Sequence, residues 1–278
     1  MKTGKILLFR IVKDKLFMGS AALFSVLSIV PLLFILLYII TNGISVINWQ
    51  FLTELPKPVG EIGGGIANAL VGTGILIFIA CLFSIPFGVA AGIHLSEQKT
   101  GRLAYAVRLS ADVLQGIPSI VIGIIAYIWL VVPMGMFSAL SGGIALGIMM
   151  LPVIVRTTEE TLKLIPKTLK EASLALGVPY YRTMLKVILP AGLSGILTGI
   201  LLSIARIAGE TAPLLFTAFG SPFMDVNILK PVNSMPLLIF NYATSPYPEW
   251  HALAWGASFV LVVFVLALNI LAKVISRR

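Results

Sequence analysis

The sequence predicts an all-α integral membrane protein with six transmembrane helices and both termini in the cytoplasm. Three observations lead to this fold class: an apolar composition, six long apolar segments and a one-sided distribution of basic residues. Of the 278 residues, 58% are hydrophobic and 11% are charged, whereas soluble domains usually carry about 25% charged residues. The mean hydropathy is +1.03. This composition excludes a water-soluble enzyme.

Six segments are apolar enough to cross a membrane, since a spanning helix needs roughly 20 mostly apolar residues. They cover about residues 16–40, 66–95, 111–132, 136–155, 191–218 and 253–275. The first segment follows a basic stretch, as in a signal peptide. It is too long for one and is followed by no small-residue cleavage site, so we expect a retained helix. Pro133 ends the third segment, and Pro190 precedes the fifth.

The basic residues set the orientation of these segments. Seventeen of the 20 Lys and Arg residues lie on one side, in the N-terminal tail, loop 96–110, segment 156–190 and the C-terminal tail. The opposite loops, 41–65 and 219–252, hold one each, and Arg206 lies inside the fifth segment. By the positive-inside rule the basic side is cytoplasmic. The net charge of +9 is thereby explained without a nucleic-acid partner.

We expect a single transmembrane domain over residues 1–278, with its core at about 64–275, because no repeat or low-complexity tract divides the chain. The chain has no G-x-x-x-x-G-K-[ST] phosphate loop, so it should not bind ATP by itself. It also lacks the Cys/His spacing of a metal site, and His94 and His251 are expected at the membrane edges. We therefore expect no catalytic residue, metal or cofactor on this chain.

The cytoplasmic segment 156–190 predicts two short helices joined by a sharp turn. Pro166 suits a helix start, and Gly177 suits a helix end that needs a positive φ. Pro179 begins a second helix, which Pro190 bounds. A short amphipathic helix at this place either lies on the lipid headgroups or docks into a groove on a partner protein.

This segment resembles the EAA loop of ABC-importer permeases, whose pattern is E-A-A-x3-G-x9-I-x-L-P. The chain has the same spacing at Glu171, Ala172, Ser173, Gly177 and Pro190. Ser173 replaces the second Ala of the pattern, and Val187 replaces its Ile. The resemblance implies a coupling helix that sits in a cleft of a separate ATPase, which would bind ATP and Mg. Glu171 and Gly177 would shape that contact.

The fifth segment carries Arg206 and Glu210, four residues apart. On a continuous helix this spacing puts the two side chains on one face, where they can pair. A lone charge at mid-membrane depth costs about 2.5–3.5 kcal/mol on insertion scales, so both must face protein or water. One interpretation is a structural ion pair. The other is an anion path, in which the forked guanidinium binds an oxyanion, Thr211 adds a hydroxyl, and Gly209 and Pro213 loosen the helix.

The stretch 206–215 looks like the fifth-span signature of phosphate-importer permeases of the PstA type. Residues 63–69 and 116–120 also resemble patterns of that subunit, and the likeness extends over roughly residues 60–220. The resemblance implies a six-span, MetI-like bundle in the bacterial cytoplasmic (inner) membrane. It also implies ATP-driven import of inorganic phosphate by alternating access. The spacing of the residues alone supports only an anion or another polar substrate.

The same resemblance implies the partners: a paralogous permease that forms a heterodimer, two copies of an ABC ATPase, and an extracytoplasmic phosphate-binding protein. The outer loop 219–252 would be the landing surface for the binding protein, or else an aromatic cap at the membrane interface. Two alternative functions are an ABC permease for another oxyanion or small polar solute, and an ion-driven carrier or channel without an ATPase.

Four further polar residues are weaker candidates for lining the substrate path. Asp112, Gln115 and Ser119 would share one face of the third segment, and Asn68 lies in the second. They either line the path or form hydrogen bonds between helices. Close helix packing is expected at four paired glycines, Gly143 with Gly147 and Gly195 with Gly199.

Overall fold

The computed structural model describes residues 2–61, 63–98 and 100–277, with side chains from Arg10 onward except Val12. The described residues form helices and loops, and no strand occurs among them apart from one isolated bridge between Phe219 and Val232. The predicted all-α fold class is confirmed.

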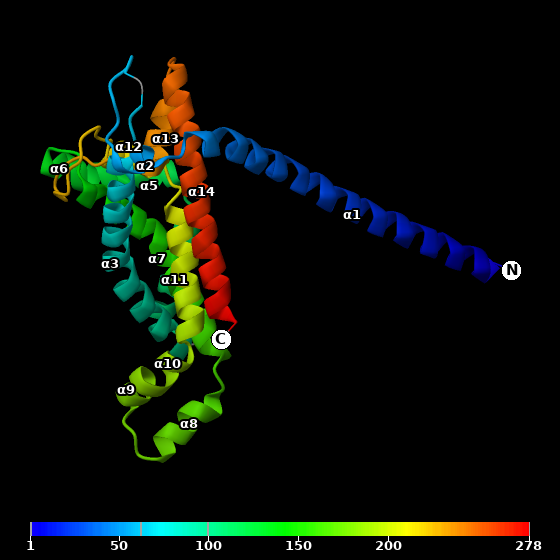
Figure 1. The fold of residues 1–278 in the computed structure, drawn as a ribbon. Coiled ribbons are helices and arrows are strands. Elements are labelled where there is room, and N and C mark those ends of the chain that lie inside the picture. The colour runs from blue at the N-terminus through cyan, green and yellow to red at the C-terminus, as the bar shows by residue number, and fades with distance from the viewer. Residues whose placement is uncertain (1, 62, 99, 278) are drawn as a thin grey trace.

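The helices follow one another from the long N-terminal helix to the C-terminal span (Figure 1). As far as residue 134 they are α1 (Lys2–Gly43), η1 (Ile44–Val46), α2 (Trp49–Thr53), α3 (Ala67–Glu97), α4 (Arg102–Gly116), α5 (Ser119–Ala126), the π-helix η2 (Tyr127–Val131) and α6 (Val132–Met134). As far as residue 191 they are α7 (Ala139–Leu164), α8 (Lys167–Ala175), α9 (Tyr180–Thr183), the π-helix η3 (Met184–Ile188) and α10 (Leu189–Ala191). The last four are α11 (Leu193–Ile207), α12 (Ala212–Thr217), α13 (Met235–Ala243) and α14 (Pro248–Ser276).

Four of these helices are long and apolar enough to span a membrane alone: α1, α3, α7 and α14. Two further spans are broken. The pair of α4 with the α5–α6 segment bends by 107°, and the pair of the α9–α10 segment with α11 bends by 66°. With each bent pair taken as one span the total is six, which agrees with the six spans predicted from the sequence.

The structure corrects the course of three predicted segments. The third bends at Pro118, because a proline disfavours the helical conformation in the residue before it; Ile117 is extended, with ψ of 130°. The fourth continues as α7 to Leu164 rather than stopping near Val155. The fifth is helical only from Leu193 to Ile207, and the chain then leaves the helix before α12 begins.

Glycines allow α3, α7 and α11 to pack closely, as the paired spacings predicted. A Cβ at Gly143 of α7 would lie 2.5 Å from Cβ of Ile79 in α3. A Cβ at Gly199 of α11 would lie 2.2 Å from Oγ1 of Thr157 in α7. Only a hydrogen at these positions lets the backbones approach, so the three helices form one tightly packed unit.

Helix α1 departs from the rest of the bundle. Its outer end contacts α14, where the Tyr38 and Trp255 rings lie edge to face with centroids 5.0 Å apart. The remainder projects away from the bundle (Figure 1), and none of its most apolar 18-residue window is buried. An apolar helix of this length is covered by lipid or by another protein.

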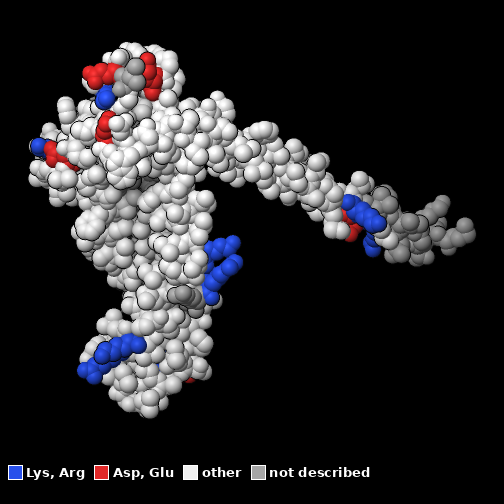
Figure 2. All heavy atoms as spheres, in the orientation of Figure 1, with Lys and Arg blue, Asp and Glu red and all other residues white. Residues whose placement is uncertain are grey.

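Charged side chains gather at the two ends of the bundle in Figure 2. Basic residues mark the end where α8 and the C-terminus lie, and others mark α1 (Figures 1 and 2). Between these ends the visible surface is almost wholly uncharged. This is the pattern that an apolar membrane core imposes, with the basic end cytoplasmic.

Candidate substrate path and coupling surface

Arg206 lies in the last turn of α11, at the point where the fifth span breaks. The helix ends at Ile207, two residues of turn follow, and Glu210 and Thr211 lie outside any helix before α12 begins at Ala212. The prediction that Arg206 and Glu210 pair on one continuous helix face is therefore wrong. No described residue forms a hydrogen bond or ion pair with either side chain.

The Arg206 side chain is exposed, whereas Glu210 and Thr211 are half-buried. The cationic group benefits from its position at the C-terminal end of α11, where the helix dipole favours positive charge. That benefit is smaller than the cost of placing a lone arginine in a span, about 2.5–3.5 kcal/mol or more. The rest of the compensation must come from outside this chain, from water, a partner protein or an anion.

The break in the fifth span lies close to the break in the third. A Cβ at Gly123 of α5 would lie 2.7 Å from Cα of Pro213 in α12. Ile117, at the bend between α4 and α5, packs in the same apolar cluster as Ile204 and Ile207 of α11. Broken helices are tolerated at membrane depth where they are buried in protein or line a water-filled cavity, and transporters build substrate sites from them.

The weaker positions of the third span separate into different environments. Gln115 is exposed and lies at the end of α4. Ser119 opens α5 beyond the bend, so it no longer shares a helix face with Gln115 and Asp112. Asp112 forms an ion pair with Arg156 of α7. The ion pair between the Asp112 carboxylate and the Arg156 guanidinium joins α4 to α7.

The helix–turn–helix of the cytoplasmic segment forms largely as predicted. Pro166 precedes α8, and Gly177 ends it with φ of +77°. The amide of Gly177 donates to the carbonyl of Leu174 at 2.9 Å, which closes the helix end. Pro190 does not bound the second helix, because the π-helix η3 passes directly into α10 and the bend comes at Gly192.

Within this segment Glu171 and Ala172 are exposed, whereas Ser173 is buried. The Ser173 hydroxyl lies 2.9 Å from the Thr183 hydroxyl, so one of them donates a hydrogen bond to the other. The serine that departs from the EAA pattern therefore fastens α8 to α9. The exposed face of the helix–turn–helix stays open for a partner.

The comparisons with known proteins agree with this geometry. The family model described as "Binding-protein-dependent transport system inner membrane component" matches residues 84–278. The phosphate transport system permease protein PstA of Yersinia pestis is 45% identical over 88% of this chain and 83% of its own length. The PstA of Haemophilus influenzae is 38% identical over 98% of both chains.

The chain belongs to the PstA permease family. Members are membrane subunits of ABC transporters and not enzymes, and they reside in the inner membrane, as predicted. An ATPase and a binding protein are general partners of such a permease. The fold also resembles a chain of the inward-facing MetNI methionine ABC transporter, with a TM-score of 0.64, 20% identity and coverage of 76% of this chain and 94% of that one. This likeness confirms the MetI-like bundle.

On the outer face of the permease, Asn68 holds two parts of the chain together. Its side chain is 2% exposed, and its amide nitrogen donates to the carbonyl of Ser221 at 2.7 Å. Two residues before α3, a Cβ at Gly65 would lie 2.4 Å from the carbonyl oxygen of Glu54. The glycine-rich stretch 63–69 therefore lets the first outer loop and loop 219–252 pack against the start of α3.

A cavity of about 650 Å³ lies between these two outer loops of the permease. Apolar and aromatic groups line much of it, including Phe219, Phe223 and Trp250. In loop 219–252, Lys230 pairs with Asp225 at 2.8 Å. The hydrogen bond from Lys230, and then that from the backbone amide of Asn227, lower the pKa of the Asp225 carboxyl. The loop therefore keeps its ion pair at any physiological pH.

A buried charge cluster at the cytoplasmic ends of the spans was not anticipated. The Glu159 side chain is 1% exposed and accepts from Arg108 of α4 at 2.7 Å and from Lys163 at 2.5 Å. Arg108 also donates to the carbonyls of Leu95 and Gln98 at the end of α3. The cluster thereby ties α3, α4 and α7 together. The sequence signal was the spacing of Arg156, Glu159 and Lys163 on one helix face.

Proposed function

We propose that this permease imports inorganic phosphate by alternating access, driven by ATP hydrolysis on a separate ATPase that binds ATP and Mg. The names of the curated relatives support the cargo. The feature of this chain that carries the proposal is the exposed guanidinium of Arg206, which has no partner among the described residues and lies at a broken span.

The chemistry of this position fits a tetrahedral oxyanion. A guanidinium is always charged and presents a planar fork of donors that matches phosphate oxygens. Glu210 and Thr211 follow in the non-helical stretch, so both can approach the same anion. A carboxylate accepts a hydrogen bond from a protonated phosphate, and a hydroxyl can donate one. Gln115 and Ser119 are secondary members of this path, and Asn68 supports its outer end.

A second permease completes the path in this proposal. Arg206 is exposed in the single chain, and an exposed arginine cannot face lipid without large cost. The long apolar surface of α1 also lies open. We assign both surfaces to a heterodimer with a paralogous permease. Two ATPase copies dock on the two coupling helices, and the phosphate-binding protein lands on the outer loops, including 219–252.

On the cytoplasmic face, α8 acts as the coupling helix. Glu171 and Ala172 are exposed and form the proposed contact with the ATPase, and Glu171 also borders the cavity between α8 and the spans. Gly177 sets the turn, and the Ser173 hydroxyl fastens α8 to α9. Pro190 lies in α10, through which the second short helix continues toward the bend at Gly192. Closure of the ATPases would move α8 and open the outer end of the path.

Uptake of radiolabelled phosphate tests the proposal. In cells that express the whole system, Arg206→Gln should lower phosphate uptake at least tenfold relative to the parent at equal membrane abundance, because the substitution removes the mid-membrane cation. Arg206→Lys should retain more, since it keeps the charge and loses the fork. Arg102→Gln, which removes the exposed arginine that begins α4, is the matched control and should transport normally.

Competition settles the cargo in the same cells. Excess unlabelled phosphate or arsenate should block uptake, because the two anions share shape and charge, and sulfate or amino acids should not. Normal phosphate uptake by Arg206→Gln would remove Arg206 from the path. An unmodified system that ignores phosphate and carries another oxyanion would overturn the proposed cargo.

A further inference from the structure

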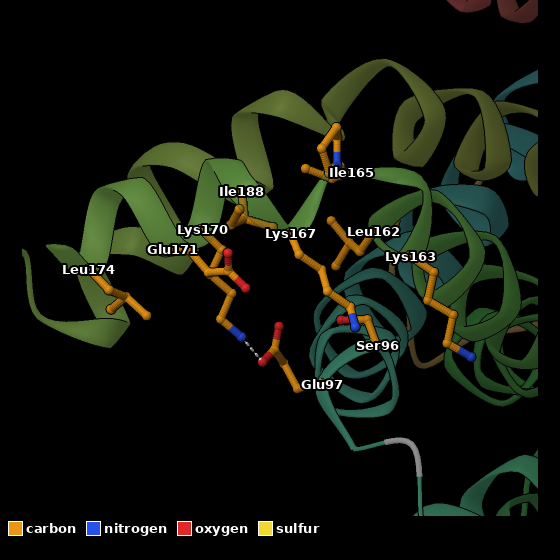
Figure 3. A pocket seen from close by; sticks show the side chains of 11 residues that line it. Ser96, Glu97, Leu162, Lys163, Ile165, Lys167, Lys170, Glu171, Leu174 and Ile188 are labelled. Carbon is orange, nitrogen blue, oxygen red and sulfur yellow. Dashed lines mark hydrogen bonds and ion pairs between the residues drawn. The ribbon is translucent and has the colours of Figure 1, made fainter.

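The coupling helix stands away from the membrane-spanning bundle. A cavity of about 450 Å³ separates α8 from the cytoplasmic ends of α3 and α7. Figure 3 shows Ser96 and Glu97 of α3 on one side of this cavity, Leu162 on another, and Lys170 and Glu171 reaching in from α8. A helix that lies over a cavity can move without displacing packed side chains. Movement of α8 then reaches the spans through the chain itself, at residues 165 and 166 toward α7 and through α9 and η3 toward α11, and through contacts across the cavity.

One polar contact crosses the cavity. The ammonium group of Lys170 on α8 pairs with the carboxylate of Glu97, the last residue of α3 (Figure 3). Tyr180 on α9 lies beside the same pair. The Lys170 nitrogen also lies 4.9 Å from the centroid of the Tyr180 ring. Among the described residues, no other side-chain ion pair or hydrogen bond joins α8 to a long span.

From Glu97 the contact continues into the centre of the permease. Helix α3 packs against α7 along its length through the glycine contacts at Gly88, Gly143 and Gly147. Leu76 and Ile79 of α3 lie in the same buried cluster as Ile207, the neighbour of Arg206. Near its outer end, the Thr73 hydroxyl accepts from the amide of Met235 at 2.9 Å. A displacement of α3 therefore reaches both Arg206 and the outer loops.

We propose that Glu97 is a positioning residue for coupling: through Lys170 it transmits the movement of the coupling helix to α3, and so to the substrate path. This inference rests on the proposed function as an ATP-driven permease. Glu97 touches neither phosphate nor ATP. Its loss should therefore lower the phosphate moved per ATP hydrolysed while leaving the affinity for phosphate unchanged.

The partial burial of the pair supports a measurable effect. The side chains of Lys170 and Glu97 are 27% and 25% exposed, so water screens their attraction less than at an open surface. Coupling energies between sites in proteins typically correspond to factors of 5–150. We expect the lower end for one partly exposed pair, about a fivefold loss in phosphate moved per ATP.

The experiment uses the complete complex in proteoliposomes, with phosphate-binding protein outside and ATP supplied to the ATPases. Phosphate uptake and ATP hydrolysis are measured in the same vesicles. Glu97→Gln and Lys170→Met should each lower the ratio about fivefold, and the double variant should be no worse than either single one. The exchanged pair Glu97→Lys with Lys170→Glu should recover at least half of the parental ratio.

Lys167→Met is the matched control. Lys167 lies one turn before Lys170 on α8, lines the same cavity and, within the described part of the chain, has no ion pair. It points into the cavity toward Ser96 in Figure 3. Its removal should leave the ratio within twofold of the parent.

Three outcomes separate the possibilities. Unchanged ratios in both single variants, with normal phosphate uptake by the parent, would overturn the role of Glu97. Additive losses in the double variant, or no recovery in the exchanged pair, would show that the two side chains act separately and would also overturn it. A parent complex that hydrolyses ATP in response to its binding protein but moves no phosphate would contradict the proposed function instead.

Discussion

Two charged regions of this permease differ in how their charges are compensated. At the cytoplasmic ends of the spans, Glu159 is buried and bound by Arg108 and Lys163. In the broken fifth span, Arg206 is exposed, and no described residue pairs with it. Both regions contain arginine near apolar surroundings, where an uncompensated charge is costly. Only the first region removes that cost within the chain itself.

The difference indicates which charges belong to the fold and which belong to the transport reaction. A cluster whose charges are paired within the chain holds helices together, as Glu159 joins α7 to α4 and, through Arg108, to α3. A charge that has no ion-pair or hydrogen-bond partner within the chain is compensated by a second molecule. The Lys170–Glu97 pair lies between these cases, because it is satisfied within the chain yet joins two parts separated by a cavity.

The largest effect is expected from breaking the ion-paired cluster around Glu159. Glu159→Ala leaves Arg108 and Lys163 without their shared carboxylate at a buried site. Arg108 and Lys163 are 22% and 42% exposed, so the loss should be about 1–3 kcal/mol, below that of a fully buried pair, and the amount of folded permease in the membrane and its melting temperature should both fall. Arg206→Ala is the contrasting variant and should leave both unchanged. Equal destabilisation by the two variants would erase the distinction between the two regions.

An intermediate effect is expected at the coupling turn. Gly177 has φ of +77°, and a Cβ built there meets no atom within 4 Å. Gly177→Trp is therefore accommodated in space but strained in the backbone, at about 1–2 kcal/mol for the left-handed conformation. The altered turn should let the ATPases hydrolyse ATP with little phosphate uptake. Measuring hydrolysis and uptake together checks this, and normal transport by the variant would count against the coupling role of the segment.

The smallest effect is expected at the outer ion pair of Asp225 and Lys230. Reversing either charge should lower the ATPase activity stimulated by the phosphate-binding protein, about twofold to threefold, if this loop is the landing surface; surface charges chiefly alter association rates. The pKa of Asp225 is lowered by Lys230, so the pair is lost only as the pH falls through that lowered value. Stimulation should accordingly show no titration from this pair between pH 6 and 8. Unchanged stimulation by both reversals would remove the loop from the landing surface.

The sequence was sufficient for the spans, the orientation and the coupling helix, because each depends on local properties. Hydropathy finds apolar helices, basic residues mark the cytoplasmic side, and Pro166 and Gly177 bound α8. The bends in the third and fifth spans were harder to predict, because hydropathy carries no information about the direction of a helix axis. Pro118 was the available signal for the third span, as were Gly209 and Pro213 for the fifth.

The tertiary ion pairs could not be predicted from spacing. Glu97 and Lys170 are 73 residues apart, and Arg108 and Glu159 are 51 apart. Such contacts depend on how separate helices are placed, which one sequence does not reveal. The predicted pair of Arg206 and Glu210 failed for a related reason: four residues of spacing mean a shared face only while the helix continues, and here it ends at Ile207.

One comparison tests most directly whether the charge without a partner in the described chain, Arg206, acts on the substrate and the ion pair of Lys170 and Glu97 acts in coupling. In proteoliposomes with the complete complex, the phosphate concentration at half-maximal uptake and the phosphate moved per ATP are measured for Arg206→Lys and Lys170→Met. We predict that Arg206→Lys raises the half-maximal concentration with little change in the ratio. Lys170→Met should lower the ratio with little change in the half-maximal concentration. If both variants change the same quantity in the same direction, the two regions are not separate in function and the account is contradicted.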